Sequence, residues 1–105
     1  MSRRVVYSAL ANAQLNAIYL EVAGEGSDHT ALRLVLDIMT RCERLAEFPL
    51  MGRRRDDISA GMRTFAFDRR VLIAYGVAPL QLRVAGIYRR GEDFEAALRG
   101  ARRDD

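Results

Sequence analysis

One stretch of the sequence, residues 31–46, limits the possible folds more than any other. Its apolar residues recur at intervals of three and four positions without interruption, as they do on one face of an α-helix. Ser27 or Asp28 is suited to cap this helix, and Phe48-Pro49 ends it. A helix of this kind is stable only when another layer covers its apolar stripe. The stripe consists of Ala31, Leu34, Val35, Ile38, Met39, Cys42, Leu45 and Ala46.

A shorter helix and a strand precede it. Ser8 is a typical N-cap residue, and apolar residues with helical spacing follow it over residues 9–23. Gly24-Glu25-Gly26 then breaks the pattern, so we expect a tight turn between two antiparallel helices. Before Ser8, the segment Arg4–Tyr7 is β-branched and aromatic, which predicts an opening strand. The apolar stripe of the first helix is Ala11, Leu15, Ile18 and Val22.

After Gly61 the apolar residues alternate with polar ones, which is the pattern of strands. Asp68-Arg69 and Pro79 separate three such runs, and connections this short join only antiparallel neighbours. We therefore expect a three-stranded meander, followed by one or two helical turns over residues 93–99. The three runs are Met62–Phe67, Arg70–Ala78 and Leu80–Arg89.

The element order is β-α-α-β-β-β, and 105 residues suffice for one core only. We predict a single α+β domain, residues 1–105, in which an antiparallel meander sheet carries an α-helical hairpin on one face. Leu32 and Leu36 lie off the buried stripe of the second helix. They belong either to the peripheral core or to a groove that binds a partner.

Composition excludes several classes of chemistry. All 17 basic residues are arginine, so a Walker-type phosphate loop and Schiff-base catalysis, which need lysine, are excluded. With His29 and Cys42 as the only residues of their kinds, a His/Cys zinc site cannot form within the chain. We expect no metal and no cofactor. No apolar run is long enough for a membrane span, the start lacks a signal-like stretch, and the lone cysteine favours the cytoplasm.

The charge is concentrated in the second half of the chain. Residues 53–105 contain 12 arginines and 8 acidic residues, whereas residues 1–52 contain 5 and 6. Guanidinium groups bind phosphates and carboxylates, so these arginines either face an acidic partner or are solvated surface charges. The sheet face opposite the helices and the charged loop after Gly52 are the expected location of a binding surface. Candidates for it are Arg54, Arg55, Arg63, Arg83, Tyr88, Arg89, Arg90 and Glu92.

Two of these candidates have competing interpretations. Arg63 alternates in phase with two phenylalanines, so it is either buried in an ion pair with Asp57 or Glu92 or available to bind an anion. Tyr88 either stacks on a base beside its arginine neighbours or is a half-buried anchor with a water-exposed hydroxyl. His29 is expected to be an exposed turn residue, and Cys42 a small core residue.

The order and spacing of these features resemble the RelE/ParE toxin superfamily, and within it the ParE-like branch. The resemblance covers residues 4–98. It rests on the opening strand with Ser8, the two helical stripes, Pro49-x-x-Gly52, Gly61-x-Arg63 and the strand Ile73-x-Tyr75-x-Val77. Two positions depart from the family pattern, which often has an acid in place of Gln14 and a histidine in place of Tyr88.

The resemblance implies a bacterial, cytoplasmic toxin of a type II toxin–antitoxin system, of the kind associated with plasmid stabilisation and neutralised by a cognate antitoxin. The ParE-like branch implies inhibition of DNA gyrase rather than an enzymatic activity. We further predict that the antitoxin lies along the helix hairpin, with Leu32 and Leu36 among its contacts. The alternative is a RelE-like ribosome-dependent mRNA endoribonuclease that uses Arg63, Arg83 and Tyr88. Arginine stays charged and transfers protons poorly, which favours gyrase inhibition. A third alternative is an inactive binding module of the same fold.

Overall fold

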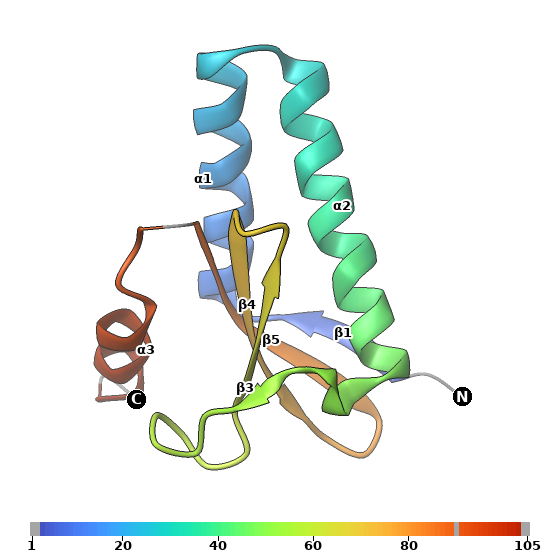
Figure 1. Cartoon of the computed structure of the whole chain (residues 1–105), viewed down its shortest axis with the longest axis vertical. Helices are drawn as coiled ribbons and strands as arrows, with labels where there is room; N and C mark the ends of the chain where they lie inside the picture. The colour runs from blue at the N-terminus through green and yellow to red at the C-terminus, as the bar shows by residue number, and fades with distance from the viewer. Residues whose placement is uncertain (1–2, 90, 104–105) are drawn as a thin grey trace.

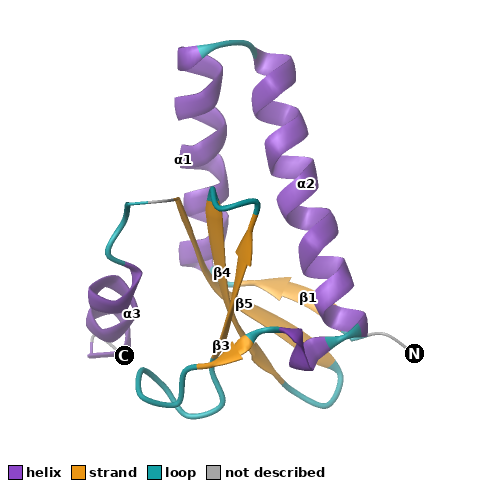
Figure 2. Cartoon of the chain, viewed as in Figure 1, coloured by secondary structure: helices purple, strands orange, loops and turns teal. Residues whose placement is uncertain are grey.

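Two antiparallel helices stand against one face of a five-stranded sheet (Figure 1, Figure 2). The computed structural model describes residues 3–89 and 91–103. The helices are α1 (Ala9–Glu25), α2 (Asp28–Glu47), a 3-10 turn η1 (Pro49–Met51) and α3 (Phe94–Arg103). The strands are β1 (Arg4–Tyr7), β2 (Arg53–Arg54), β3 (Arg63–Phe67), β4 (Val71–Val77) and β5 (Gln81–Arg89).

Both long helices begin where the sequence predicts. The Ser8 hydroxyl accepts a hydrogen bond from the Ala11 N–H at 3.0 Å and donates one to the Ala85 carbonyl at 2.9 Å. Ser27 caps α2 by accepting from the Thr30 N–H at 3.2 Å. Each hydroxyl satisfies a backbone N–H that has no partner inside its helix. Ser8 in addition ties the start of α1 to β5.

The sheet is mixed, with the strand order β1-β5-β4-β3-β2. β3, β4 and β5 form the predicted antiparallel meander. β1 pairs in parallel with β5, with Arg4 opposite Gln81 and Tyr7 opposite Val84. β2 pairs with the outer edge of β3, so part of the segment predicted as a charged loop is a short strand. The α+β fold is therefore confirmed, and the sheet has two more strands than the predicted meander.

The main core lies between the hairpin and the sheet. Where β4 pairs with β5, β5 contains a bulge. Ala74 is opposite Gly86 and Tyr75 is opposite Val84, which leaves Ala85 without a partner. The extra residue lets Ile87 face the helices along with the residues before the bulge. The buried residues of this core include Ala11, Leu15, Ile18, Leu34, Ile38, Cys42, Leu45, Ile73, Tyr75, Leu82, Val84 and Ile87.

The opposite face of the sheet is covered in part, which corrects the expectation that it is free. A second apolar cluster there contains Ile58 from the loop before β3, Tyr88 from β5 and Leu98 from α3. Figure 1 shows α3 on the side of the sheet away from the hairpin. The terminal helix is longer than the one or two turns predicted, and its apolar side chains close over one end of this face.

Candidate functional site

Arg63 has a structural position. It lies opposite Tyr75, on the sheet face that carries the hairpin, and its Nη1 donates to the Gly52 carbonyl at 2.9 Å. The Tyr75 hydroxyl accepts from the Gly52 N–H at 2.8 Å and donates to the Pro49 carbonyl at 2.7 Å. These three bonds hold the Pro49–Gly52 turn against the sheet. The prediction that Arg63 pairs with the carboxylate of Asp57 or Glu92 is wrong, because its guanidinium bonds to the Gly52 carbonyl instead.

Arg55, and not Arg63, makes the ion pairs of this region, with its own side chain mostly covered and its carboxylate partners exposed. Its side chain is 14% exposed, and its guanidinium contacts Asp57 at 2.9 Å and Glu95 at 2.8 Å. Arg99 reaches Asp57 at 3.5 Å, so the network joins α3 to the loop before β3. Hydrogen bonding to Arg55 lowers the pKa of Asp57 to about 2. The network fixes α3 in place, and its Glu95 and Arg99 were not recognised in the sequence.

Tyr88 is buried beneath α3. Its side chain is 2% exposed, and its ring centroid lies 6.1 Å from that of Phe94. Among the described residues the hydroxyl makes no hydrogen bond of normal geometry, and burial raises the pKa of Tyr88 against a smaller opposing effect of the Gln14 side chain. The expectation of a water-exposed hydroxyl is wrong. The hydroxyl is therefore not offered to a base or a phosphate at the protein surface.

The remaining candidates do not form one surface. Arg54 is exposed and pairs with Asp56 at 2.8 Å, while Arg83 bonds to Gln81 on β5. Arg89 pairs with Glu21 of α1 at 3.1 Å. Glu92 accepts a hydrogen bond from the Arg89 N–H at 3.1 Å. Arg90 lies outside the described residues. The single basic face expected from the sequence is therefore not assembled.

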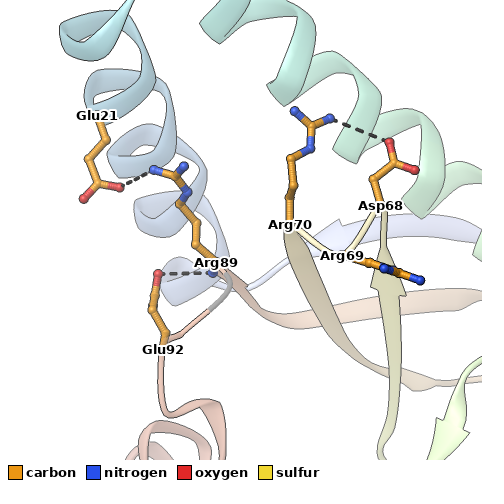
Figure 3. A pocket seen from close by; sticks show the side chains of 6 residues that line it. All are labelled: Glu21, Asp68, Arg69, Arg70, Arg89 and Glu92. Carbon is orange, nitrogen blue, oxygen red and sulfur yellow. Dashed lines mark hydrogen bonds and ion pairs between the residues drawn. The ribbon is translucent and has the colours of Figure 1, made fainter.

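The structure instead brings arginines together at the β3–β4 turn and the end of β5. A cavity of about 620 Å³ opens there, and Figure 3 shows its two walls: Arg89 with two acids on one side, and the turn residues on the other. Arg70 contacts Asp68 at 3.7 Å. The cavity is lined by Glu21, Asp68, Arg69, Arg70, Arg89 and Glu92. Sequence reasoning treated Asp68-Arg69 only as a connection.

The backbone of this turn has an uncommon conformation. Asp68 and Arg69 both have positive φ, 50° and 59°, and the Arg70 N–H closes the turn on the Phe67 carbonyl at 3.0 Å. Two residues with positive φ match the twist of a two-residue hairpin, where asparagine and glycine are usual. Holding a bulky residue such as Arg69 there costs roughly 1 kcal/mol.

An apolar patch lies on the outer side of α2. Leu32 and Leu36 are exposed, as is Met39, which the sequence had placed on the buried stripe. Their spacing of four and three residues puts them on one line along the helix. His29 is exposed and Cys42 is buried, both as predicted. We refer to Leu32, Leu36 and Met39 below as the α2 patch.

The described residues offer neither a metal site nor a membrane-spanning helix. Among residues 3–89 and 91–103, no three His, Cys, Asp or Glu side chains gather closely enough to hold a metal ion. Within the same residues, no helix has the length and apolar character that crossing a bilayer requires.

Comparisons with known proteins give one matching family model and a solved structure of similar fold. The model of the family described as "ParE toxin of type II toxin-antitoxin system, parDE" matches residues 5–94. A solved structure titled "Chromosomal ParDE TA system from P. aeruginosa" is similar with a TM-score of 0.72 and 23% sequence identity. The match covers 85% of this chain and 97% of that one. The search of curated proteins found no match.

Proposed function

The chain belongs to the ParE toxin family of type II toxin–antitoxin systems, and from this premise we propose that it inhibits DNA gyrase and is neutralised by a cognate antitoxin. One observation carries the choice of gyrase over mRNA. The side chains that an RNA-cleaving site would use are occupied or buried: Arg63 holds the Gly52 carbonyl, and Tyr88 lies under α3. No lysine is available as a proton donor, and His29 is exposed at the start of α2.

The chemistry of RNA cleavage explains why this matters. Cleavage requires a base at the 2′-OH, stabilisation of charge at phosphorus and a proton for the leaving oxygen. Arg83 is exposed and supplies charge. An arginine keeps its charge and is therefore a poor general acid or base. A protein of this geometry therefore supports binding of a macromolecular target better than acid–base catalysis.

The test compares two activities of the purified protein. We expect it to block supercoiling of relaxed plasmid DNA by gyrase and to leave ribosome-bound mRNA intact. Adding the antitoxin encoded beside the gene restores supercoiling. Ribosome-dependent cleavage that disappears in Tyr88→Phe would replace the gyrase proposal with the nuclease alternative. Normal growth when the chain is expressed without its antitoxin would favour an inactive binding module.

The α2 patch supports a location for the antitoxin. Leu36 is 51% exposed, and exposed apolar residues in a line along a helix are typical of a surface that binds another amphipathic segment. Leu36→Glu is expected to weaken antitoxin binding measured by calorimetry, while Leu80→Glu, at an 81% exposed turn position, is not. If Leu36→Glu folds normally and binds with unchanged affinity, the antitoxin lies elsewhere.

A further inference from the structure

Two cavities with different chemistry meet at the β3–β4 turn. The larger is polar and is formed by arginines and acids (Figure 3). The smaller has a volume of about 240 Å³ and shares Arg69, Arg70, Arg89 and Glu92 with it. The apolar side chains of the smaller cavity are Ala66, Val71, Leu72, Tyr88 and Phe94. A ligand that fills both must carry a charged group next to a bulky apolar one.

The charges of the larger cavity are unequally satisfied. Arg89 is paired with Glu21 at 3.1 Å, and Arg70 has only a contact of 3.7 Å with Asp68. Arg69 has no ion pair within residues 3–89 and 91–103, and Figure 3 shows its side chain at the rim of the cavity, directed away from the Arg89 wall and without a bonded partner. Its positive φ sets the direction in which the side chain leaves the backbone. An exposed guanidinium without an ion pair is free to bind a carboxylate or a phosphate.

The acidic residues of the site decide between these two anions. Glu21, Asp68 and Glu92 stand in the same cavity as the arginines. The three carboxylates repel the dense negative charge of a nucleic-acid backbone. A peptide with a single carboxylate can instead pair that group with Arg69 and donate hydrogen bonds from its N–H groups to the carboxylates of the cavity. The adjoining apolar cavity fits a leucine or an aromatic side chain of the same peptide.

We propose that this double cavity binds a segment of the cognate antitoxin in which an acidic side chain adjoins a large apolar one. The carboxylate pairs with Arg69, and the apolar side chain rests on Leu72 and Phe94. This inference rests on the proposed function, because it takes the antitoxin as the partner. It adds a second contact region, separate from the α2 patch.

Arg69→Gly tests the proposal without disturbing the fold. Glycine adopts positive φ freely, so this variant removes the charge and relieves the turn, and its melting temperature is expected to be equal to or higher than that of the wild type. Its affinity for the antitoxin, measured by calorimetry at low salt, is expected to fall about tenfold, as for loss of a charge-assisted contact. Arg53→Ala, an exposed arginine on edge strand β2, is the matched control and is expected to retain full affinity.

A second measurement locates the contact directly. On addition of antitoxin, the backbone amide signals of Arg69 and Leu72 are expected to shift in NMR spectra. Unchanged affinity of Arg69→Gly together with unshifted signals would overturn the inference while the antitoxin still binds. No binding of the antitoxin to the wild type would instead contradict the proposed function. Binding of a short DNA or RNA duplex that Arg69→Gly abolishes, with antitoxin affinity unchanged, would identify a phosphate site and overturn the peptide assignment.

Discussion

The Tyr75 hydroxyl accepts a hydrogen bond from the Gly52 N–H, 23 residues earlier in the chain, at 2.8 Å. The same hydroxyl donates to the Pro49 carbonyl at 2.7 Å. A fully buried side chain of the central strand therefore satisfies two backbone polar groups of the turn that follows α2. This one phenol connects the end of the helical hairpin to the sheet.

Tyr75→Phe is expected to lower the free energy of unfolding by about 1–3 kcal/mol, because it leaves a buried N–H and a carbonyl without a partner. Tyr88→Phe is the matched control: it also removes a hydroxyl from a buried tyrosine, but that hydroxyl has no partner among the described residues. Its stability is expected to be unchanged or higher by up to about 1 kcal/mol. Urea denaturation measures both, and equal losses would contradict the assignment.

Gly52→Ala is expected to destabilise the protein by about 1–3 kcal/mol, since a Cβ there would lie 2.9 Å from the Thr64 carbonyl oxygen and would overlap the Tyr75 ring. Gly76→Ala is a control in the same sheet, because no atom lies within 4 Å of its added Cβ. That variant is expected to unfold at the same denaturant concentration or slightly higher. A Gly52→Ala protein as stable as Gly76→Ala would show that the turn moves away without cost.

Stability is expected to fall as the pH is lowered from 4 to 2. The pKa of Asp57 is about 2 in the folded chain, below about 3.9 in an unfolded one, so the folded state binds this proton less tightly. Its ion pairs therefore favour folding above about pH 4, and this contribution is lost as the pH approaches 2.

Melting temperatures recorded from pH 7 to pH 2 check this dependence. Asp57→Asn is expected to melt at a lower temperature than the wild type at pH 7, and the difference is expected to close near pH 2. Glu47→Gln removes an exposed carboxylate that has no ion pair in the described part of the chain. It is expected to leave the curve unchanged. A constant difference between Asp57→Asn and the wild type at every pH would refute the assignment.

The Cys42 thiol is expected to react slowly with disulfide reagents at pH 8. It is fully buried, and burial raises the pKa of Cys42 to about 11. Little of the thiol is therefore ionised at pH 8, and the reagent has little access to the sulfur atom. Absorbance of the released thiol reports the rate. Leu80→Cys in a Cys42→Ala background places a thiol at an exposed turn and is expected to react much faster. Rapid modification of native Cys42 would contradict its place in the core.

The helices and the meander were predictable because their signals are local. Ser8 and Ser27 cap the helices as expected, and the three alternating runs became β3, β4 and β5. Pairing across long distances was not predictable in this way. The residues of Arg4–Tyr7 predict a strand but do not indicate which edge of the sheet it joins. Its parallel pairing with β5 therefore could not be predicted from the sequence.

The candidate site was predicted less well, for a physical reason. Tyr88 is buried because Phe94 and Leu98 of α3 close over it. Two apolar residues in a short terminal segment do not indicate from the sequence that this segment covers the sheet. Arg63 shares a face with Phe65, as its parity indicated, but its partner is the Gly52 carbonyl, which no side-chain pattern identifies. Arg69 was overlooked because hairpin turns are usually read for glycine and asparagine.

The parallel pairing of β1 with β5 has a consequence for synthesis of the protein. The first strand has no sheet edge to join until Gln81–Arg89 has left the ribosome, so the sheet closes only after all of its other strands have been made. A nascent chain interrupted before that point lacks the strand between β1 and β4 and exposes the apolar side of its hairpin. Chaperones and proteases act on exposed apolar surface of this kind, so incomplete chains are expected to be short-lived.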